Sequence, residues 1–143
     1  MRVYLSVPMI ANRTPSVALS MARAIRDAGH EISSPWVLGP VEGYAPDVVN
    51  IFERDMRGAE KSDAIVADVT SPSIGVGMEL MAAYKAGRKV IVAAKEGSTV
   101  SHMLLHMDGK EHIEFKDEQD LYEKLMGVLV PLASSGRKAA NQK

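Results

Sequence analysis

Short apolar runs alternate with amphipathic stretches along almost the whole chain, and no other feature of the sequence constrains the fold as strongly. Each run has the length and composition of a buried strand, and each stretch repeats its apolar residues at helical spacing. We predict strands at Arg2–Val7, His30–Ser34, Ala64–Asp68, Lys89–Ala94 and His112–Phe115. We predict helices at Val17–Ala28, Asp47–Glu60, Gly75–Ala86, Thr99–Met107 and Asp117–Leu132. Such units predict a parallel sheet with helices on both faces.

Five strands favour one arrangement of this sheet. We predict an α/β fold, a flavodoxin-like (Rossmann-like) three-layer sandwich with strand order 2-1-3-4-5, because the six-stranded dinucleotide fold needs one more strand. The 143 residues suffice for one domain, which we place at residues 1–133. Residues 134–143 carry no large apolar side chain, so we expect a flexible tail there. A ligand of such a sheet lies at the carboxyl ends of the first and third strands, which points to residues 7–13 and 68–79.

Composition and charge exclude several classes of protein. Seventeen basic and eighteen acidic residues give a net charge of −1, whereas a protein that follows a nucleic-acid polymer carries a basic excess. The absence of cysteine excludes zinc–thiolate sites, iron–sulfur clusters and thiol nucleophiles, and it favours the cytoplasm. No apolar stretch is long enough to cross a membrane, and the first residues do not have the pattern of a signal peptide. The four scattered histidines form no metal-binding motif, so we expect no metal and no cofactor.

A carboxylate stands on the apolar face of the second predicted helix. On a helical wheel, Asp55 falls in the same stripe as Phe52 and Met56. Burial of a carboxylate is unfavourable unless the group is paired or takes up a proton, so Asp55 is a candidate proton donor. A side chain that leans to solvent, or that pairs with Arg54 or Arg57, agrees equally well with this pattern.

The third predicted strand leads through a turn of small residues into the next helix. Ser73, Gly75 and Gly77 keep side chains clear of the backbone, so amide N–H groups and the positive helix end can face an anion. We expect Glu79, placed in the first helical turn, to stay ionised because the helix dipole favours negative charge there. A plain tight turn followed by a dipole-stabilising glutamate accounts for the same residues.

The two carboxylates suggest a chemistry when they are taken together. One desolvated and one ionised carboxylate are the usual acid and nucleophile of retaining glycoside hydrolysis. Tyr4, on the strand next to the third one, has a hydroxyl that can bind a carboxylate, or a ring that only packs. Trp36 can stack on a base, or can pack beneath the second loop.

Several separated motifs occur together in this chain. Asp55 precedes Ser-Asp-Ala-Ile-Val-Ala-Asp-Val-Thr at 62–70, and Ser-Pro-Ser-Ile-Gly-Val-Gly-Met-Glu-Leu follows at 71–80, with Ser-His-Met at 101–103. In this order they resemble the 2′-deoxynucleoside 5′-phosphate N-hydrolases, a branch of the nucleoside 2-deoxyribosyltransferase superfamily. The resemblance covers most of the chain.

The resemblance implies a role for each matching residue. Glu79 would attack C1′ of the deoxyribose, Asp55 would act as the acid that helps the base to leave, and Tyr4 would orient the nucleophile. The reaction would be a double displacement through a covalent deoxyribosyl 5-phosphate on Glu79, with water as the second nucleophile.

The resemblance also implies how the substrate is bound. Ser73 and the amides of the Gly75–Gly77 turn would hold the 5′-phosphate. Ser101, with Met103 beside it, would come from the neighbouring subunit of a homodimer and complete the site. The resemblance therefore predicts a small nucleotide substrate and a second copy of the chain as the partners.

The first loop departs from the family pattern. Such proteins usually carry a glycine, serine and arginine loop after the first strand, but residues 6–13 here read Ser-Val-Pro-Met-Ile-Ala-Asn-Arg. Arg13 can still reach a phosphate, whereas Ile10 stands where an arginine is expected. Trp36 ends a segment that in the family is acidic or contains histidine. Base preference and the choice between deoxyribose and ribose therefore stay open.

Other functions agree with parts of the sequence. A nucleoside 2-deoxyribosyltransferase, a ribonucleotide N-hydrolase of the CMP type and a non-catalytic nucleotide-binding module all remain alternatives. The serines at 73 and 101 favour the hydrolase, because a transferase acts on nucleosides without a phosphate. Receiver domains and flavodoxins share the predicted fold but need an acidic pair or a phosphate loop after the first strand, and neither is present here.

Overall fold

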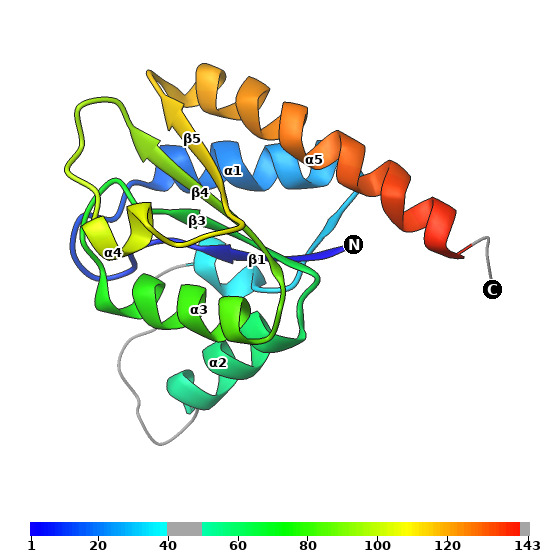
Figure 1. The fold of residues 1–143 in the computed structure, drawn as a ribbon. Helices are drawn as coiled ribbons and strands as arrows, with labels where there is room; N and C mark the ends of the chain where they lie inside the picture. Colours follow the sequence, from blue (N-terminus) through cyan, green and yellow to red (C-terminus); the bar gives the residue numbers. More distant parts are fainter. Residues whose placement is uncertain (40–49, 141–143) are drawn as a thin grey trace.

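The computed structural model describes the backbone of residues 1–39 and 50–140, and the side chains through residue 135. Its sheet contains β1 (Arg2–Ser6), β2 (Glu31–Ile32), β3 (Ala64–Asp68), β4 (Lys89–Lys95) and β5 (Glu111–Phe115). All neighbouring strands are parallel, and their order is β2-β1-β3-β4-β5 (Figure 1). The predicted α/β fold and strand order are confirmed.

Helices cover both faces of this sheet. Helices α1 (Pro15–Asp27) and α5 (Glu118–Ala140) pack together on one face, and α2 (Ile51–Lys61) and α3 (Ile74–Lys85) pack together on the other (Figure 1). A 3-10 helix, η1 (Pro35–Leu38), follows β2, and the short helix α4 (His102–Leu105) lies between β4 and β5. None of the helices in the described part of the chain is long and apolar enough to span a bilayer.

The alternation of side chains along β1 divides the core into two parts. Val3 and Leu5 pack with α1 and α5 in one apolar cluster. Tyr4 lies in the other cluster, with residues of α2 and α3. Ser6 follows the same alternation, so the last side chain of β1 is a buried hydroxyl on the side of α2 and α3.

Strand β2 is shorter than predicted. The strand expected at His30–Ser34 is only two residues long in the structure. At Ser34 the side chain takes the place of the backbone in bonding to β1: its Oγ accepts from Leu5 N and donates to Leu5 O, both at 2.8 Å. Pro35 follows and has no N–H to continue the pairing. The chain turns into η1 at this point, which places Trp36 over the end of the sheet.

Three predicted helices differ from the observed ones. Helix α2 begins at Ile51, where the Asn50 side chain accepts from Glu53 N at 3.0 Å, and residues 47–49 of the prediction lie outside the described residues. The helix predicted at 99–107 contracts to α4, whose end is fixed when Lys110 Nζ donates to the carbonyls of Leu105 and Met107.

The last helix extends further than predicted. Helix α5 passes the expected end at Leu132 and continues to Ala140. Residues 133–140 are rich in Ala, Lys and Arg, which favour a helix even without an apolar stripe to bury. The flexibility of residues 134–143 stays a prediction, and residues 141–143 lie outside the described part.

Candidate active site

The candidate site lies at the carboxyl ends of β1 and β3. Ser6, the last residue of β1, donates from its Oγ to Glu79 Oε2 at 2.6 Å. This bond ties α3 to the middle of the sheet and fixes the Glu79 carboxylate above the end of β1. The nearby segments 7–13 and 68–79 are those that the sheet order points to.

A cavity of about 450 Å³ opens at this edge of the sheet. Five residues predicted from the sequence line it together: Trp36, Asp55, Ser73, Gly75 and Glu79. They come from η1, α2, the turn before α3, and α3 itself. The structure therefore brings both carboxylates and the start of α3 into one cavity of a size that suits a small ligand.

Glu79 is not held ionised in the way that the sequence predicts. Burial and, to a smaller extent, the negative charge of Asp55 raise the pKa of Glu79 to about 7, although the Ser6 hydrogen bond opposes this shift. Glu79 is the sixth residue of α3, which begins at Ile74, so it lies beyond the first turn, where the helix dipole acts most strongly. The nucleophile candidate is thus a carboxyl group that titrates near neutral pH.

Asp55 combines the two interpretations that its position allows. Its side chain lines the cavity and is only 16% exposed, while Arg54 Nε donates to its Oδ1 at 2.9 Å. The Arg54 guanidinium also lies over the Trp36 ring, 4.4 Å from the centroid. The arginine thereby holds Asp55 at the cavity and covers one face of Trp36, which restricts the predicted stacking on a base.

Tyr4 lies beneath the cavity and is fully buried. Its ring meets the Trp36 ring edge to face, with centroids 6.2 Å apart. Its hydroxyl has no hydrogen-bond partner of good geometry among the described residues, yet it is close enough to Glu79 for each group to affect the other. Burial and the charge of Glu79 raise the pKa of Tyr4, so its hydroxyl stays protonated and can face the carboxylate.

Two residues that organise the site were missed in the sequence. Ser6 places a buried hydroxyl at the end of an apolar strand. A polar residue at the end of a central strand is the signal that could have identified it from the sequence. Gly58 lies on α2 against Tyr4: a Cβ at this position would lie 2.8 Å from Tyr4 Cε2 and 3.8 Å from Trp36 Cη2. No local pattern marks Gly58, because its neighbours are distant in sequence.

Replacing Gly58 by alanine is expected to lower kcat by about tenfold to a hundredfold, because a shift of about 1 Å at a catalytic group is that damaging. Tyr4 has no free space, so α2 must move away from the sheet and carry Asp55 with it. The measurement is steady-state turnover of a nucleoside 5′-monophosphate, the substrate that the sequence resemblance implies. The control is Gly127→Ala on α5, where a new Cβ meets no atom within 4 Å. Full activity of the Gly58 variant would contradict the close fit.

Fewer residues than predicted can contribute to an anion site at the start of α3. The Ser73 side chain caps the helix, accepting from Val76 N at 3.3 Å, and a Cβ at Gly75 would meet no atom within 4 Å. The Gly77 amide donates to the Ser73 carbonyl inside the helix, and Gly77 does not line this cavity. Ser73 and Gly75 are thus the members of the predicted set that lie at the cavity.

Three other predicted residues lie elsewhere. The Arg13 guanidinium donates to the carbonyls of Val37 and Gly39 and does not line the cavity. Ser101 and Met103 line a second, largely apolar cavity of about 670 Å³, which shares Ser73 with the first. Their roles stay predictions.

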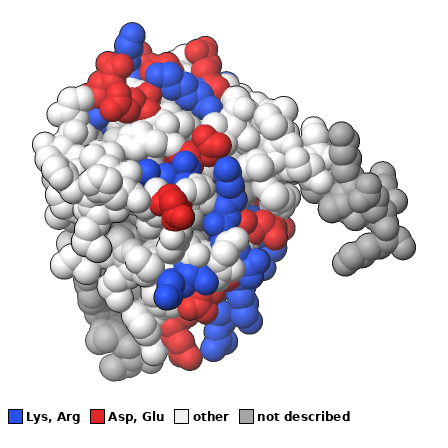
Figure 2. All heavy atoms as spheres, in the orientation of Figure 1, with Lys and Arg blue, Asp and Glu red and all other residues white. Residues whose placement is uncertain are grey.

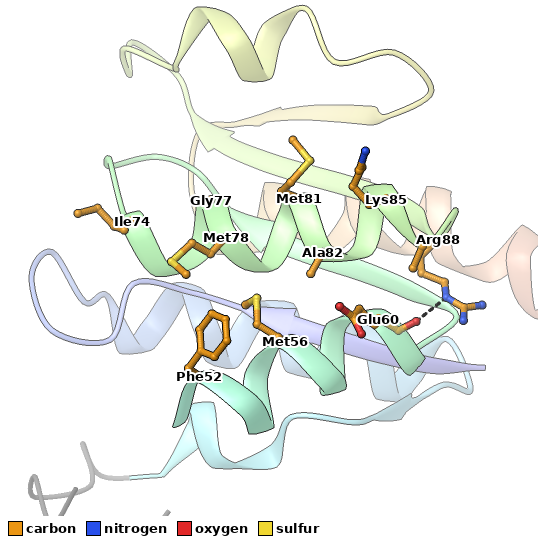
Figure 3. Close-up of a pocket in the computed structure, with 11 residues that line it drawn as sticks. Phe52, Met56, Glu60, Ile74, Gly77, Met78, Met81, Ala82, Lys85 and Arg88 are labelled. Atoms are coloured by element: carbon orange, nitrogen blue, oxygen red, sulfur yellow. Dashed lines mark hydrogen bonds between the residues drawn. The ribbon is translucent and has the colours of Figure 1, made fainter. Parts of the chain in front are cut away.

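A third cavity, of about 1010 Å³, is a groove between α2 and α3. Figure 3 shows Phe52 and Met56 of α2 facing Met78 of α3, with Arg88 bound to the Glu60 carbonyl at the far end, 2.7 Å away. Neither Asp55 nor Glu79 lines this groove, so we do not place the chemistry there. In the described ranges, no three His, Asp or Glu side chains lie close enough to hold a metal ion.

No family profile matches the chain, but individual proteins do. A protein of Thermofilum pendens, provisionally named 2′-deoxynucleoside 5′-phosphate N-hydrolase 1, is 30% identical over 138 residues, which cover 90% of this chain and 95% of the relative. The chain belongs to the 2′-deoxynucleoside 5′-phosphate N-hydrolase family. A member from Methanococcoides burtonii is 40% identical over 88 residues, 59% of this chain and 72% of the relative. The 5-hydroxymethyl-dUMP N-hydrolase of Branchiostoma floridae is 36% identical over 94 residues, 64% of this chain and 87% of the relative.

Solved structures agree with this N-hydrolase in fold. A CMP N-glycosidase of Clostridium botulinum has a TM-score of 0.65 and 19% identity, over 87% of this chain and 98% of the other. A 2-deoxyribosyltransferase of Bacillus psychrosaccharolyticus has a TM-score of 0.60 and 22% identity, over 85% and 90%. The resemblance predicted from the sequence motifs is confirmed, and as a member of the family the chain is an N-glycosidase.

Proposed function

We propose that the enzyme hydrolyses the N-glycosidic bond of 2′-deoxynucleoside 5′-monophosphates and releases a free base and deoxyribose 5-phosphate. The observation that carries the proposal is the single cavity in which Asp55, Glu79 and the start of α3 meet. A nucleophile, an acid and a site for the phosphate are then within the span of one nucleotide. The names of the relatives, N-hydrolases of nucleoside 5′-phosphates, support the same reaction.

The reaction proceeds in two displacements. The Glu79 carboxylate attacks C1′, the bond from C1′ to the base nitrogen breaks, and Asp55 gives its proton to the leaving base. Water then attacks C1′ of the ester on Glu79, gives a proton to Asp55, and releases deoxyribose 5-phosphate. Tyr4 holds Glu79 in place, and Ser73 with the Gly75 amide binds the phosphate.

The pair of carboxyl groups must hold one proton in total for this mechanism. That proton is needed on Asp55, while Glu79 must be ionised. Because the pKa of Glu79 is raised to about 7, Glu79 holds this proton at rest, and the reactive form requires its transfer to Asp55. The rate is therefore expected to fall above about pH 7, where this proton is lost, and also under acid conditions, where a second proton binds to the pair.

Replacing Ser6 by alanine is expected to move the alkaline limb of this profile to higher pH. The Ser6 hydroxyl stabilises the ionised form of Glu79, so its removal raises the pKa of Glu79 further. The measurement is kcat/KM as a function of pH. Ser16→Ala, which only removes an exposed hydrogen bond to Glu118, serves as the control. An unchanged limb in the Ser6 variant would show that Glu79 does not set it.

The activity itself is tested with purified protein and the four natural deoxynucleoside monophosphates. We expect chromatography to detect free base from at least one of them, and no base from the same nucleosides without phosphate. Survival of all four nucleotides with excess protein would overturn the hydrolase. A transferase would instead use plain deoxynucleosides and would need a second base as acceptor. Parallel reactions with ribonucleotides test the choice of sugar.

We propose that a second copy of the chain completes the site through Ser101 and Met103. Figure 2 shows a broad area without charged side chains on the side where Figure 1 places α4. Two large apolar side chains that line the second cavity are exposed, Ile74 at 86% and Met103 at 83%. Such an area is typical of a surface that another protein covers. Ser101 lines the same cavity, and its side chain makes no capping hydrogen bond to α4.

Mixing two inactive variants tests this shared site. A heterodimer of a Glu79→Ala chain and a Ser101→Ala chain would contain one site with both natural residues. We expect the mixture to regain activity that neither variant has alone. No gain after complete subunit exchange would place Ser101 outside the neighbouring site.

A further inference from the structure

The active-site cavity has two sides with different chemistry. The strand order β2-β1-β3 places the loop after β1 between η1, which follows β2, and the start of α3, which follows β3. The α3 side carries Ser73 and Gly75. The β2 side is lined by apolar residues of three elements: Met9, Ile10, Trp36, Val37 and Ile51. Glu79, bound to Ser6 of β1, lies between the two sides.

The polar side chains at the cavity are already engaged. In the described part of the chain, those that line it are Arg54, Asp55, Ser73 and Glu79. Arg54 is bound to Asp55, Ser73 caps α3, and Glu79 accepts from Ser6. The Trp36 Nε1 atom is buried and is not exposed to the cavity. Within residues 1–39 and 50–135, the β2 side therefore offers a ligand an apolar surface and no side chain dedicated to reading hydrogen bonds.

Contacts within the chain hold this apolar side in place. Asn12 adopts a left-handed conformation, with φ of 59°, which turns the loop after β1. The next residue, Arg13, donates to the carbonyls of Val37 and Gly39 and ties the loop to η1. Through these two bonds Arg13 positions the apolar side. Ile10, in the same loop, remains 74% exposed and can be covered by a ligand.

We propose that the β2 side binds the base of the nucleotide through apolar contact and not through hydrogen bonds to the base edge. This inference rests on the proposed function, which places the phosphate at α3 and the sugar at Glu79. The substrates are then deoxynucleotides with different bases, among which the larger and less polar ones bind best. An apolar pocket gains affinity with each methylene that it covers, and it distinguishes hydrogen-bonding patterns poorly.

A pair of ligands of equal shape tests the inference. The first is thymidine 5′-monophosphate, and the second is the 5′-monophosphate of the difluorotoluene C-deoxyriboside, whose base analogue lacks conventional hydrogen-bonding groups. Both are titrated against the Glu79→Gln variant, which prevents turnover, with fluorescence of Trp36, the single tryptophan of the chain, as the signal. We expect the apolar analogue to bind as tightly as thymidine monophosphate, or more tightly. Binding weaker by about a hundredfold, as in a site that reads hydrogen bonds, would overturn the inference.

A matched pair of variants locates the contact. Ile10→Asn is expected to weaken binding of the apolar analogue by about tenfold, because part of its apolar cover is lost. Leu19→Asn, which changes a 60% exposed leucine on α1 outside the cavity, is expected to leave binding unchanged. Equal binding by the wild type and Ile10→Asn would overturn the inference. If the natural nucleotides are neither bound nor cleaved, the proposed function fails instead.

Discussion

Replacement of Glu79 by glutamine is expected to lower kcat by about 10⁴-fold or more, because the first displacement then has no nucleophile. The amide keeps the shape of the side chain, and as an acceptor it retains the Ser6 hydrogen bond. The loss therefore reports on the carboxylate and not on packing. The measurement is release of free base from the best nucleotide. In the wild type, acid quenching during turnover should trap deoxyribosyl 5-phosphate on the peptide that contains Glu79, as detected by mass spectrometry.

The control for this experiment is Glu123→Gln, an exposed glutamate on α5, which should retain full activity. A second readout shows that the Glu79 variant is folded. Because the pKa of Glu79 is raised from 4.5 to about 7, the native state holds this proton more tightly than the unfolded state. The stabilisation of the native state by this proton is present at low pH and is lost as the pH rises through about 7. Glutamine has no such loss, so the variant should unfold at a higher temperature than the wild type above pH 7. A stable variant that retains full activity would exclude Glu79 as the nucleophile.

Replacement of Asp55 by asparagine is expected to lower kcat by about 10³-fold for natural bases, because the leaving base no longer receives a proton. The pH profile should also change shape. Without the acid, the rate depends only on ionisation of Glu79 and should rise with pH to a plateau, so the alkaline limb disappears. The measurement is kcat over the same pH range as for the Ser6 variant.

A substrate that needs no proton separates two roles of Asp55. In 7-methyl-2′-deoxyguanosine 5′-monophosphate the base is already cationic and leaves without protonation. We expect Asp55→Asn to cleave this nucleotide almost as fast as the wild type does. An equal loss on both substrates would mean that Asp55 only maintains the geometry of the site, through Arg54 and Trp36.

The sequence predicts those features of the site that depend on local pattern and on sheet order. The parallel strands and their order bring the loop after β1 and the turn before α3 to the same edge of the sheet. Helical periodicity marks Asp55 as a candidate carboxylate on the inward face of its helix, and Asp55 lines the cavity. The raised pKa of Glu79 could not be predicted, because it arises mainly from burial, which a local pattern does not show.

Most of the remaining differences between the predicted and the observed site arise from contacts between residues that are far apart in the sequence. The bond between Ser6 and Glu79 joins residues that are 73 positions apart, and the bond between Arg13 and Gly39 spans 26 positions. Arg13 was predicted near a phosphate from its chemistry alone, whereas backbone carbonyls are equally good acceptors for its guanidinium. The role of Gly58 is invisible until the fold places Tyr4 against it.

The contact at Gly58 has a consequence for how this family can vary. The volume above Gly58 is filled from below by Tyr4 and from η1 by Trp36. A side chain can enter this volume from α2 or from β1, but not from both, because a Cβ at Gly58 would lie 2.8 Å from Tyr4 Cε2 while Trp36 Cη2, at 3.8 Å, is in ordinary contact. Relatives with a larger residue at the position of Gly58 should therefore have a smaller side chain at the position of Tyr4, and these two positions should covary.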